Sequence, residues 1–181
     1  MARIPYPDES KLPAALRGQA WADAPNVTRM LAGASEAVYT GFGAFGSALI
    51  NGSDLPGKLR EIAILRSGYV CNSKYETWQH EALGRYVGLT DTQIDAVREG
   101  NLDSPALDEE ERAVLAFADD VIQNVRASDE TLAGVRKFLT DAQVIDLILV
   151  TGAYLMVSRF LETTGVEFDE NPIDWDEFSK S

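Results

Sequence analysis

The fold of this 181-residue chain is decided by residues 141–164, which read DAQVIDLILVTGAYLMVSRFLETT. Apolar residues occupy nearly every face of a helix drawn through this stretch, whereas a strand would need polar and apolar residues to alternate. Thr140 and Gln143 form a capping box at its start, and Gly165 follows its end. We therefore expect one long helix that is buried on every side. In a domain of this size, part of that burial can come from another subunit.

Helical periodicity continues outward from this stretch, and no segment alternates with the period of a strand. A capping box at Thr90 and Gln93 opens another helix, and Gly88 ends the one before it. Further helices are expected over residues 35–50, 56–71, 73–87 and 108–125. The fold class is therefore all-α, and we expect a single domain. An irregular arm (1–23) precedes it, and an acidic surface tail (169–181) follows it.

Composition excludes several classes of protein. The formal net charge is -13, which disfavours binding to nucleic acid or to anionic membranes, since both are recognised through basic patches. The single cysteine, Cys71, excludes an intrachain disulfide and a multi-cysteine zinc site. No secretory signal is recognisable, and the apolar stretch Val144–Val157 carries Asp146 and is short for a membrane span. We expect a cytoplasmic protein without membrane or nucleic-acid partners.

The sequence contains two motifs whose surroundings exclude the function that each usually indicates. The glycines between Gly41 and Gly46 match a dinucleotide-binding pattern, but no strand precedes them, so close helix packing is the better interpretation. His80-Glu81 begins like the helix of a zinc protease, yet the chain has no second histidine. We therefore expect neither a metal nor a cofactor.

One group of side chains remains as a candidate catalytic site. On a helix over residues 73–87, Ser73, Glu76 and His80 are three and four residues apart and share one face. Glu61 lies on the preceding helix, which can fold back alongside after Asn72. Two carboxylates, a hydroxyl and an imidazole then converge. Because histidine titrates near neutrality beside a carboxylate, this is a plausible acid–base site.

The same residues resemble the carboxymuconolactone decarboxylase family, which shares its helical fold with the alkylhydroperoxidase AhpD. The resemblance rests on Leu59-Arg-Glu61 and on Tyr75-Glu76-x-x-x-His80-x-x-x-Gly84-x-x-x-Gly88. It covers residues 24–168, and it implies the AhpD-like helical fold over this domain, assembled as a trimer or hexamer. It also implies a cofactor-free lyase that acts on a small carboxylated or lactone compound from aromatic catabolism. His80 would be the general acid/base, Glu61 its orienting or relay partner, and Glu76 a second acid/base or a substrate-positioning group.

The peroxidase branch of this family uses a Cys-x-x-Cys pair, and its two cysteine positions are occupied here by Ser73 and Glu76. A hydroxyl and a carboxylate cannot cycle between dithiol and disulfide. Peroxide reduction through Cys71 alone stays open as an alternative, although a small buried hydrophobic role is expected for that residue. Arg66 and Arg159 are the candidates for binding a substrate carboxylate.

Each candidate also has a structural interpretation. His80 could pair with Glu76 only to stabilise the helix, Glu61 could lie on a solvated face, and Ser73 could simply cap the helix. A non-catalytic, ligand-binding oligomer with the family fold is therefore a further alternative. Tyr75 and Trp78 are expected in the core or in the wall of a pocket.

Overall fold

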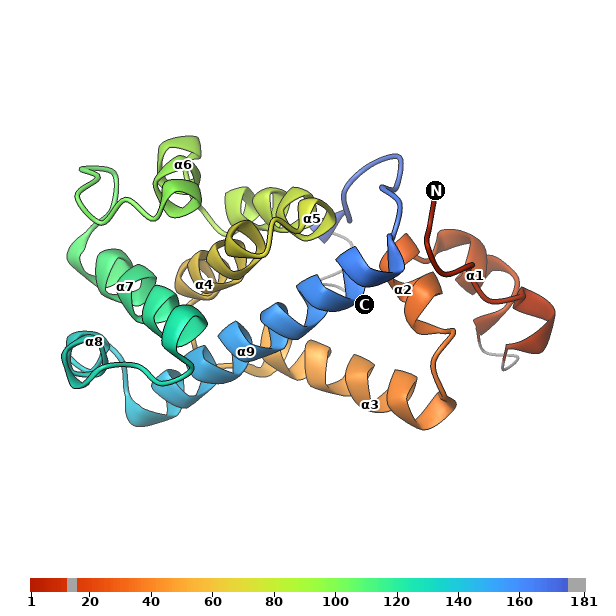
Figure 1. Ribbon diagram of the computed structural model, residues 1–181, viewed down its shortest axis with the longest axis horizontal. Helices are drawn as coiled ribbons and strands as arrows, with labels where there is room; N and C mark the ends of the chain where they lie inside the picture. Colours follow the sequence, from red (N-terminus) through yellow and green to blue (C-terminus); the bar gives the residue numbers. More distant parts are fainter. Residues whose placement is uncertain (13–15, 176–181) are drawn as a thin grey trace.

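The computed structural model describes residues 1–12 and 16–175, which form helices and connecting turns without a strand (Figure 1). The all-α prediction is confirmed. The elements are η1 (Glu9–Lys11), α1 (Gln19–Asp23), α2 (Asn26–Leu31), α3 (Glu36–Ser47), the π-helix η3 (Ala48–Gly52), α4 (Gly57–Val70), α5 (Lys74–Tyr86), α6 (Asp91–Glu99), α7 (Glu109–Asn124), α8 (Asp129–Val135) and α9 (Asp141–Thr164).

The helices predicted from periodicity and capping are present. The capping boxes at Thr90 and Thr140 are formed, with each threonine hydroxyl accepting from the backbone of a glutamine at the third helical position. Helix α9 ends at Gly165, whose φ of +69° is a left-handed conformation that glycine adopts at little cost. Helices α1, α2 and α8 were not predicted, because five to seven residues are too few to display a helical period. The expected irregular N-terminal arm therefore contains a short helix.

Helix α4 is the centre of the core. It packs against α5, α7 and α9, and side chains around its whole circumference are buried, including Ile62 and Leu65. Helix α7 presents Phe117 to this core and α9 presents Leu147, both with no exposed surface. An all-round buried helix needs neighbours on every side. In this chain, that helix is α4.

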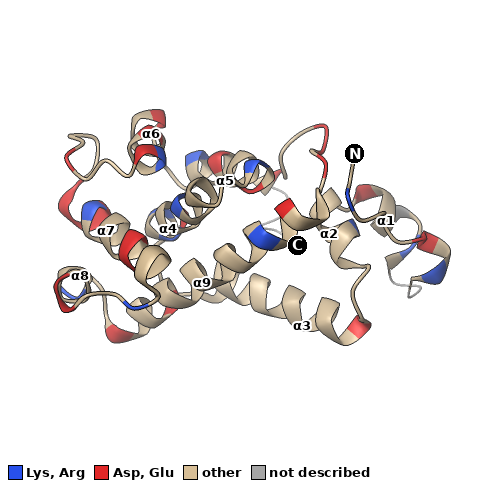
Figure 2. Ribbon diagram, in the orientation of Figure 1, with Lys and Arg blue, Asp and Glu red and all other residues tan. Residues whose placement is uncertain are grey.

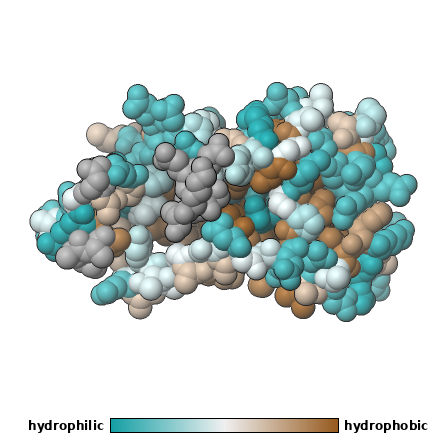
Figure 3. Space-filling model, turned by 180° about the vertical axis from the view of Figure 1, so that it is seen from behind, coloured by the Kyte–Doolittle hydropathy of each residue, from teal (hydrophilic) through white to brown (hydrophobic). Residues whose placement is uncertain are grey.

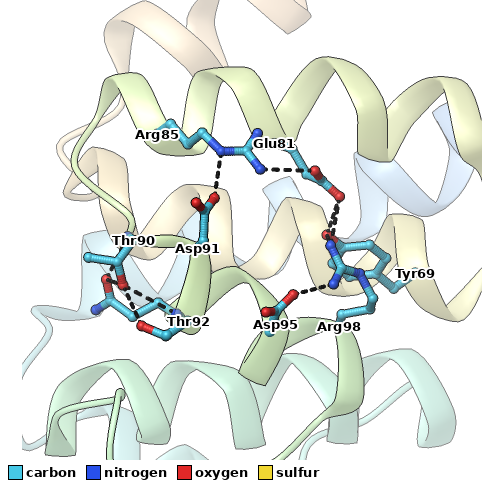
Figure 4. A network of polar contacts seen from close by, with 9 residues as sticks. Tyr69, Glu81, Arg85, Thr90, Asp91, Thr92, Asp95 and Arg98 are labelled. Atoms are coloured by element: carbon cyan, nitrogen blue, oxygen red, sulfur yellow. Dashed lines mark hydrogen bonds and ion pairs between the residues drawn. The ribbon is translucent and has the colours of Figure 1, made fainter.

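Helix α6 is connected to α4 and α5 by ion pairs and hydrogen bonds at the surface (Figure 4). Glu81 of α5 accepts hydrogen bonds from Tyr69 of α4 and from Arg98 of α6. Arg85 joins Glu81 to Asp91. Each of these pairs at the surface contributes little stability, and together they connect α6 to α4 and α5.

Helices α3 and α9 leave apolar side chains uncovered. No residue of α3 is buried, and its only charged residue, Glu36, stands at its start (Figure 2). On α9, a stripe of apolar side chains faces away from the core and is 43–57% exposed: Ile145, Ile148, Leu149 and Met156. Hydrophobic side chains also reach the surface on the face shown in Figure 3. The prediction that α9 is buried on every side is thus not met within one chain.

By length and composition, α9 is able to cross a membrane. The shorter apolar stretch considered in the sequence analysis, Val144–Val157, did not predict a membrane span. In the structure, however, the side of α9 that carries Leu147, Val150 and Thr151 is fully buried against the core of the same domain.

Residues 169–175 do not project as a surface arm but fold back onto α2 and α5. Asp169 accepts hydrogen bonds from the backbone N–H of Asn26 (2.8 Å) and from the Tyr75 hydroxyl (2.5 Å). The backbone N–H of Ile173 donates to Gln79 (2.8 Å). The remainder of the expected tail, residues 176–181, lies outside the described residues. The described part of the tail is therefore a component of the fold.

Candidate active site

The turn between α4 and α5 brings the candidate residues together. Asn72 adopts a positive φ of 52°, and the backbone N–H of Ser73 donates to the carbonyl of Gly68 (2.9 Å). At Gly68, an added Cβ would lie 2.9 Å from the Thr77 methyl group, so the absence of a side chain lets α4 and α5 approach closely. Residues one and two turns away on each helix consequently face one another, among them Glu61 and His80.

His80 lies between two carboxylates. Its Nδ1 is 2.7 Å from Glu61 Oε2, a short hydrogen bond, and its Nε2 is 3.1 Å from Glu76 Oε1. The second contact is at ion-pair distance but lacks the alignment of a hydrogen bond, so Glu76 Oε1 has no hydrogen-bonding partner among the described residues. Glu61 is fully buried, and Glu76 and His80 are 4% and 6% exposed. The predicted convergence of these three residues is present.

Burial and charge shift the protonation of this group. Burial raises the pKa of Glu76 to about 7, with His80 opposing the rise and Glu61 adding to it. Burial lowers the pKa of His80, but the carboxylates of Glu61 and Glu76 outweigh it, so the pKa ends above its ordinary value. Both shifts favour keeping a proton on the Glu76–His80 pair near neutral pH, and the two groups titrate as a unit.

Arg60 balances the remaining charge, and sequence reasoning missed it. It is 7% exposed, its Nε donates to Glu61 Oε1 (3.1 Å), and one guanidinium nitrogen donates to the carbonyl of Ile50 (2.8 Å). With Glu61 paired to Arg60, one proton on the Glu76–His80 pair leaves the whole group electrically neutral, whether it resides on His80 or on Glu76. A neutral arrangement is what burial of four ionisable groups requires.

A cavity of about 660 Å³ opens on this group, and both Glu76 and His80 line it. Its other walls come from α2, α3, η3, α9 and the C-terminal segment, and they are mostly apolar and aromatic. They include Tyr39, Phe42, Phe45, Tyr75, Tyr154 and Trp175. The Tyr154 ring stands edge-on to the His80 ring at 4.8 Å. A small ligand would therefore touch aromatic surface on several sides and two proton-transfer groups at one end.

The other predicted site residues are placed differently. Ser73 is fully buried, but it does not line the cavity, and its hydroxyl neither caps α5 nor has another hydrogen-bonding partner among the described residues. The expectation that its side chain caps the helix is wrong, because the hydroxyl is not directed at the free N–H groups of the first turn. Cys71 is partly exposed in the α4–α5 turn, outside the cavity lining, rather than buried.

Neither arginine proposed for substrate binding reaches the cavity. Arg66 pairs with Asp119 of α7, and Arg159 is exposed and donates to the carbonyl of Leu155 one turn earlier. Among the described residues that line the cavity there is no lysine or arginine, and Glu76 is the only carboxylate. The described part of the chain also holds no group of three metal-ligating side chains.

The structure resembles several solved proteins. It matches the AhpD core of an uncharacterised peroxidase-related protein from Ralstonia eutropha (TM-score 0.79, 22% identity, 93% of each chain). It also matches a peroxidase-related protein from Silicibacter (0.78, 21%, 93% of this chain and 91% of that one). A third match is a cysteine-to-alanine variant of the debrominase Bmp8 in complex with tribromopyrrole (0.74, 15%, 93% and 92%).

No protein-family model and no curated protein matches the chain. The agreement with solved structures over nearly the whole length defines the fold class: an all-helical protein built around a hairpin of two helices and one long core helix. The chain has the AhpD-like fold.

Proposed function

We propose that this protein is a cofactor-free acid–base enzyme of the lyase type, acting on a small carbonyl or lactone compound of the kind formed in aromatic catabolism. The observation that carries the proposal is the position of His80 Nε2, 3.1 Å from Glu76 Oε1, at the end of an apolar cavity that both residues line. A base and an acid side by side in a dry site can remove a proton from a carbon next to a carbonyl while protonating an oxygen.

The roles follow from the geometry. Glu61 accepts the Nδ1 proton of His80, which leaves Nε2 facing Glu76 and the cavity. Starting from neutral His80 and protonated Glu76, the imidazole takes the carbon-bound proton and the carboxylic acid gives its own to the oxygen that becomes negative. The pair ends as imidazolium and carboxylate, and the substrate as its enol. For a lyase reaction, the enol then returns its hydroxyl proton to the carboxylate as the bond from the adjacent carbon to a leaving oxygen breaks, and the imidazolium protonates that oxygen, which restores the starting state.

Among the substrates suggested by the resemblance, a lactone or carbonyl compound suits this site better than a carboxylated one. A carboxylate would lie beside Glu76, and the described lining residues include no lysine or arginine to bind it. Loss of carbon dioxide, the reaction of the family's namesake, is therefore the less supported reaction of this class. Among the solved relatives in fold, the debrominase complex also holds an aromatic ring compound, tribromopyrrole.

We also propose that the protein assembles as a homo-oligomer, a trimer or hexamer as the resemblance implies. The stripe of apolar side chains on α9 supports this assembly, because a contiguous hydrophobic surface is stabilised by a partner. Helix α3 supports it as well, since α3 forms part of the cavity wall although none of its residues is buried within one chain.

The test is exchange of carbon-bound hydrogen for deuterium, followed by proton NMR in D₂O, with phenylacetone as a neutral probe and phenylacetate as its charged counterpart of similar shape. The wild-type protein should accelerate exchange in phenylacetone and not in phenylacetate. His80→Gln and Glu76→Gln should each slow this exchange by about 10²–10⁴-fold, the usual contribution of a general acid–base group.

Glu111→Gln is the matched control, since Glu111 is a buried carboxylate at the start of α7, outside the cavity. Exchange per folded molecule should be unchanged in that variant and in Cys71→Ser. Binding of phenylacetone without accelerated exchange would favour the non-catalytic, ligand-binding alternative. Turnover of an organic peroxide that disappears in Cys71→Ser would favour the peroxide-reducing alternative.

A further inference from the structure

Gln79 is a buried polar side chain that takes no part in the proposed proton transfer. It precedes His80 on α5, is 4% exposed and lines the cavity. Its Oε1 accepts the backbone N–H of Ile173 at 2.8 Å, and its Nε2 donates to the Tyr75 hydroxyl at 3.2 Å. A buried amide that satisfies both of its ends in this way fixes the position of what it binds. Here it binds the C-terminal segment.

Asp169 secures the other end of that segment. One carboxylate oxygen accepts the backbone N–H of Asn26 at the start of α2, and the other accepts the Tyr75 hydroxyl and lies 3.5 Å from Gln79 Nε2. Burial raises the pKa of Tyr75, and the nearby Asp169 raises it further, so the phenol remains a donor at any ordinary pH. Residues 169–173 are thus held at both ends by one side of α5.

The consequence for the cavity is a wall made of Ile173 and Trp175. The Trp175 ring lies 6.1 Å from the His80 ring, with the two planes inclined by 47°. A ligand bound beside His80 would therefore lie close to the indole. Bulk placed at such a position decides which molecules fit, because a rigid aromatic wall yields little to a larger ligand.

We propose that Trp175 is a specificity-determining residue for the ligand of this cavity, and that Gln79 is the positioning residue that holds it there. The ligand class that fits is a small, uncharged, planar compound that presents one face to the indole and its polar group to the Glu76–His80 pair. This assignment rests on the cavity being the ligand site of the proposed function, but it requires only binding and not the acid–base reaction.

The first experiment measures the surroundings of the Trp175 indole in the absence of a ligand. The protein is produced with fluorotryptophan, which gives one fluorine NMR signal for each of its three tryptophans. The signal that is missing in Trp175→Phe is the signal of Trp175. Gln79→Met, which keeps the length of the side chain but neither hydrogen bond, should move the Trp175 signal towards that of a solvated indole. Gln123→Met, at an exposed glutamine of α7, should move none of the three signals. A Trp175 signal that is unchanged in Gln79→Met would overturn the positioning role.

The second experiment reads selectivity by titrating phenylacetone and the larger naphthylacetone, each followed by ligand-detected NMR. The wild-type protein should prefer phenylacetone. Trp175→Ala should shift the ratio of the two dissociation constants towards naphthylacetone by about tenfold or more, the range expected for removing bulk from a pocket. Phe168→Ala is the control, since this aromatic residue of the same segment is 53% exposed and does not line the cavity.

If the ratio of the two dissociation constants in Trp175→Ala stayed within about twofold of the wild-type ratio, the specificity role would be contradicted, since a tenfold or larger change is expected. Failure of both probes to bind the wild-type protein would contradict it as well. Failure of the proposed function looks different. In that case the signal shifts and the selectivity are as described, but His80→Gln exchanges deuterium as fast as the wild-type protein.

Discussion

A carboxyl group in water loses its proton near pH 4, but burial keeps the proton on Glu76 up to about pH 7. The folded state therefore binds this proton more tightly than the unfolded state does. The resulting stabilisation is complete below the unfolded pKa, and it is lost as the pH rises through the folded pKa of about 7. The pKa of His80 is also raised, so its contribution is lost with rising pH as well.

The first prediction at this scale concerns Glu76→Gln, which removes the titrating group but keeps its size. Between pH 5 and pH 8, the free energy of unfolding of the wild-type protein should fall relative to that of Glu76→Gln by about 3 kcal/mol, since each pKa unit corresponds to about 1.4 kcal/mol. Urea denaturation at both pH values measures it. Parallel pH profiles for the two proteins would show that Glu76 ionises in the folded state as it does in water.

The residues of the acid–base group could be predicted because their proximity is local. Glu76 and His80 are neighbours on any helix, and Glu61 needs only one turn of chain reversal to join them. Arg60 could not be predicted, since a lysine or arginine beside a glutamate is ordinary on a solvated helix. Trp175 could not be predicted either. It lies in an acidic segment without periodicity, and its contact with His80 depends on distant hydrogen bonds by Asp169 and Ile173.

At the scale of the elements, the α4–α5 hairpin depends on the close approach at Gly68. Gly68→Ala would place a Cβ 2.9 Å from the Thr77 methyl group, and separating the helices to relieve this contact should cost about 1–3 kcal/mol. Thr77→Ser removes the methyl group and retains the hydroxyl, so it should recover most of this loss in the double variant. Thermal or urea denaturation of the four proteins in the cycle tests this coupling.

Gly134→Ala provides the matched control, because this glycine of α8 has open space where the Cβ would be added. It should be neutral or stabilising by up to about 1 kcal/mol, the helix propensity difference between glycine and alanine. If Gly68→Ala were equally harmless, or if Thr77→Ser gave no recovery, the approach of the two helices would not depend on that glycine.

The elements themselves were predictable where short-range chemistry marks their ends. The capping boxes at Thr90 and Thr140 predict where α6 and α9 begin, because the donor and the acceptor are only three positions apart. Ser73 shows the limit of that reasoning. A serine occupies the cap position of α5, but its side chain is enclosed by tertiary packing and does not perform the capping.

At the scale of the whole molecule, the exposed apolar stripe on α9 leads to a prediction about assembly. Light scattering should report a multiple of 19.8 kDa, with three or six subunits. Ile148→Glu or Leu149→Glu would bury a charge in the contact and should reduce the mass to that of smaller species. Val125→Glu, at a position that is 91% exposed and lies outside the stripe, should leave the mass unchanged. A monomeric wild-type protein at micromolar concentration would contradict the proposed assembly.

The hydrogen bond between Asn26 and Asp169 spans 143 positions of sequence, whereas the Glu61–His80 bond spans 19. Joining distant segments costs more chain entropy than closing a hairpin, so the two parts of the site are expected to form at different times. On this expectation, the contact between Glu61 and His80 forms before the wall of Ile173 and Trp175 encloses it. In the reverse direction, release of that wall would rehydrate Glu76 and return its acidity to that of an ordinary carboxyl group. The proposed chemistry of the site would thus depend on a contact between distant parts of the chain, and it would be lost while every helix was still intact.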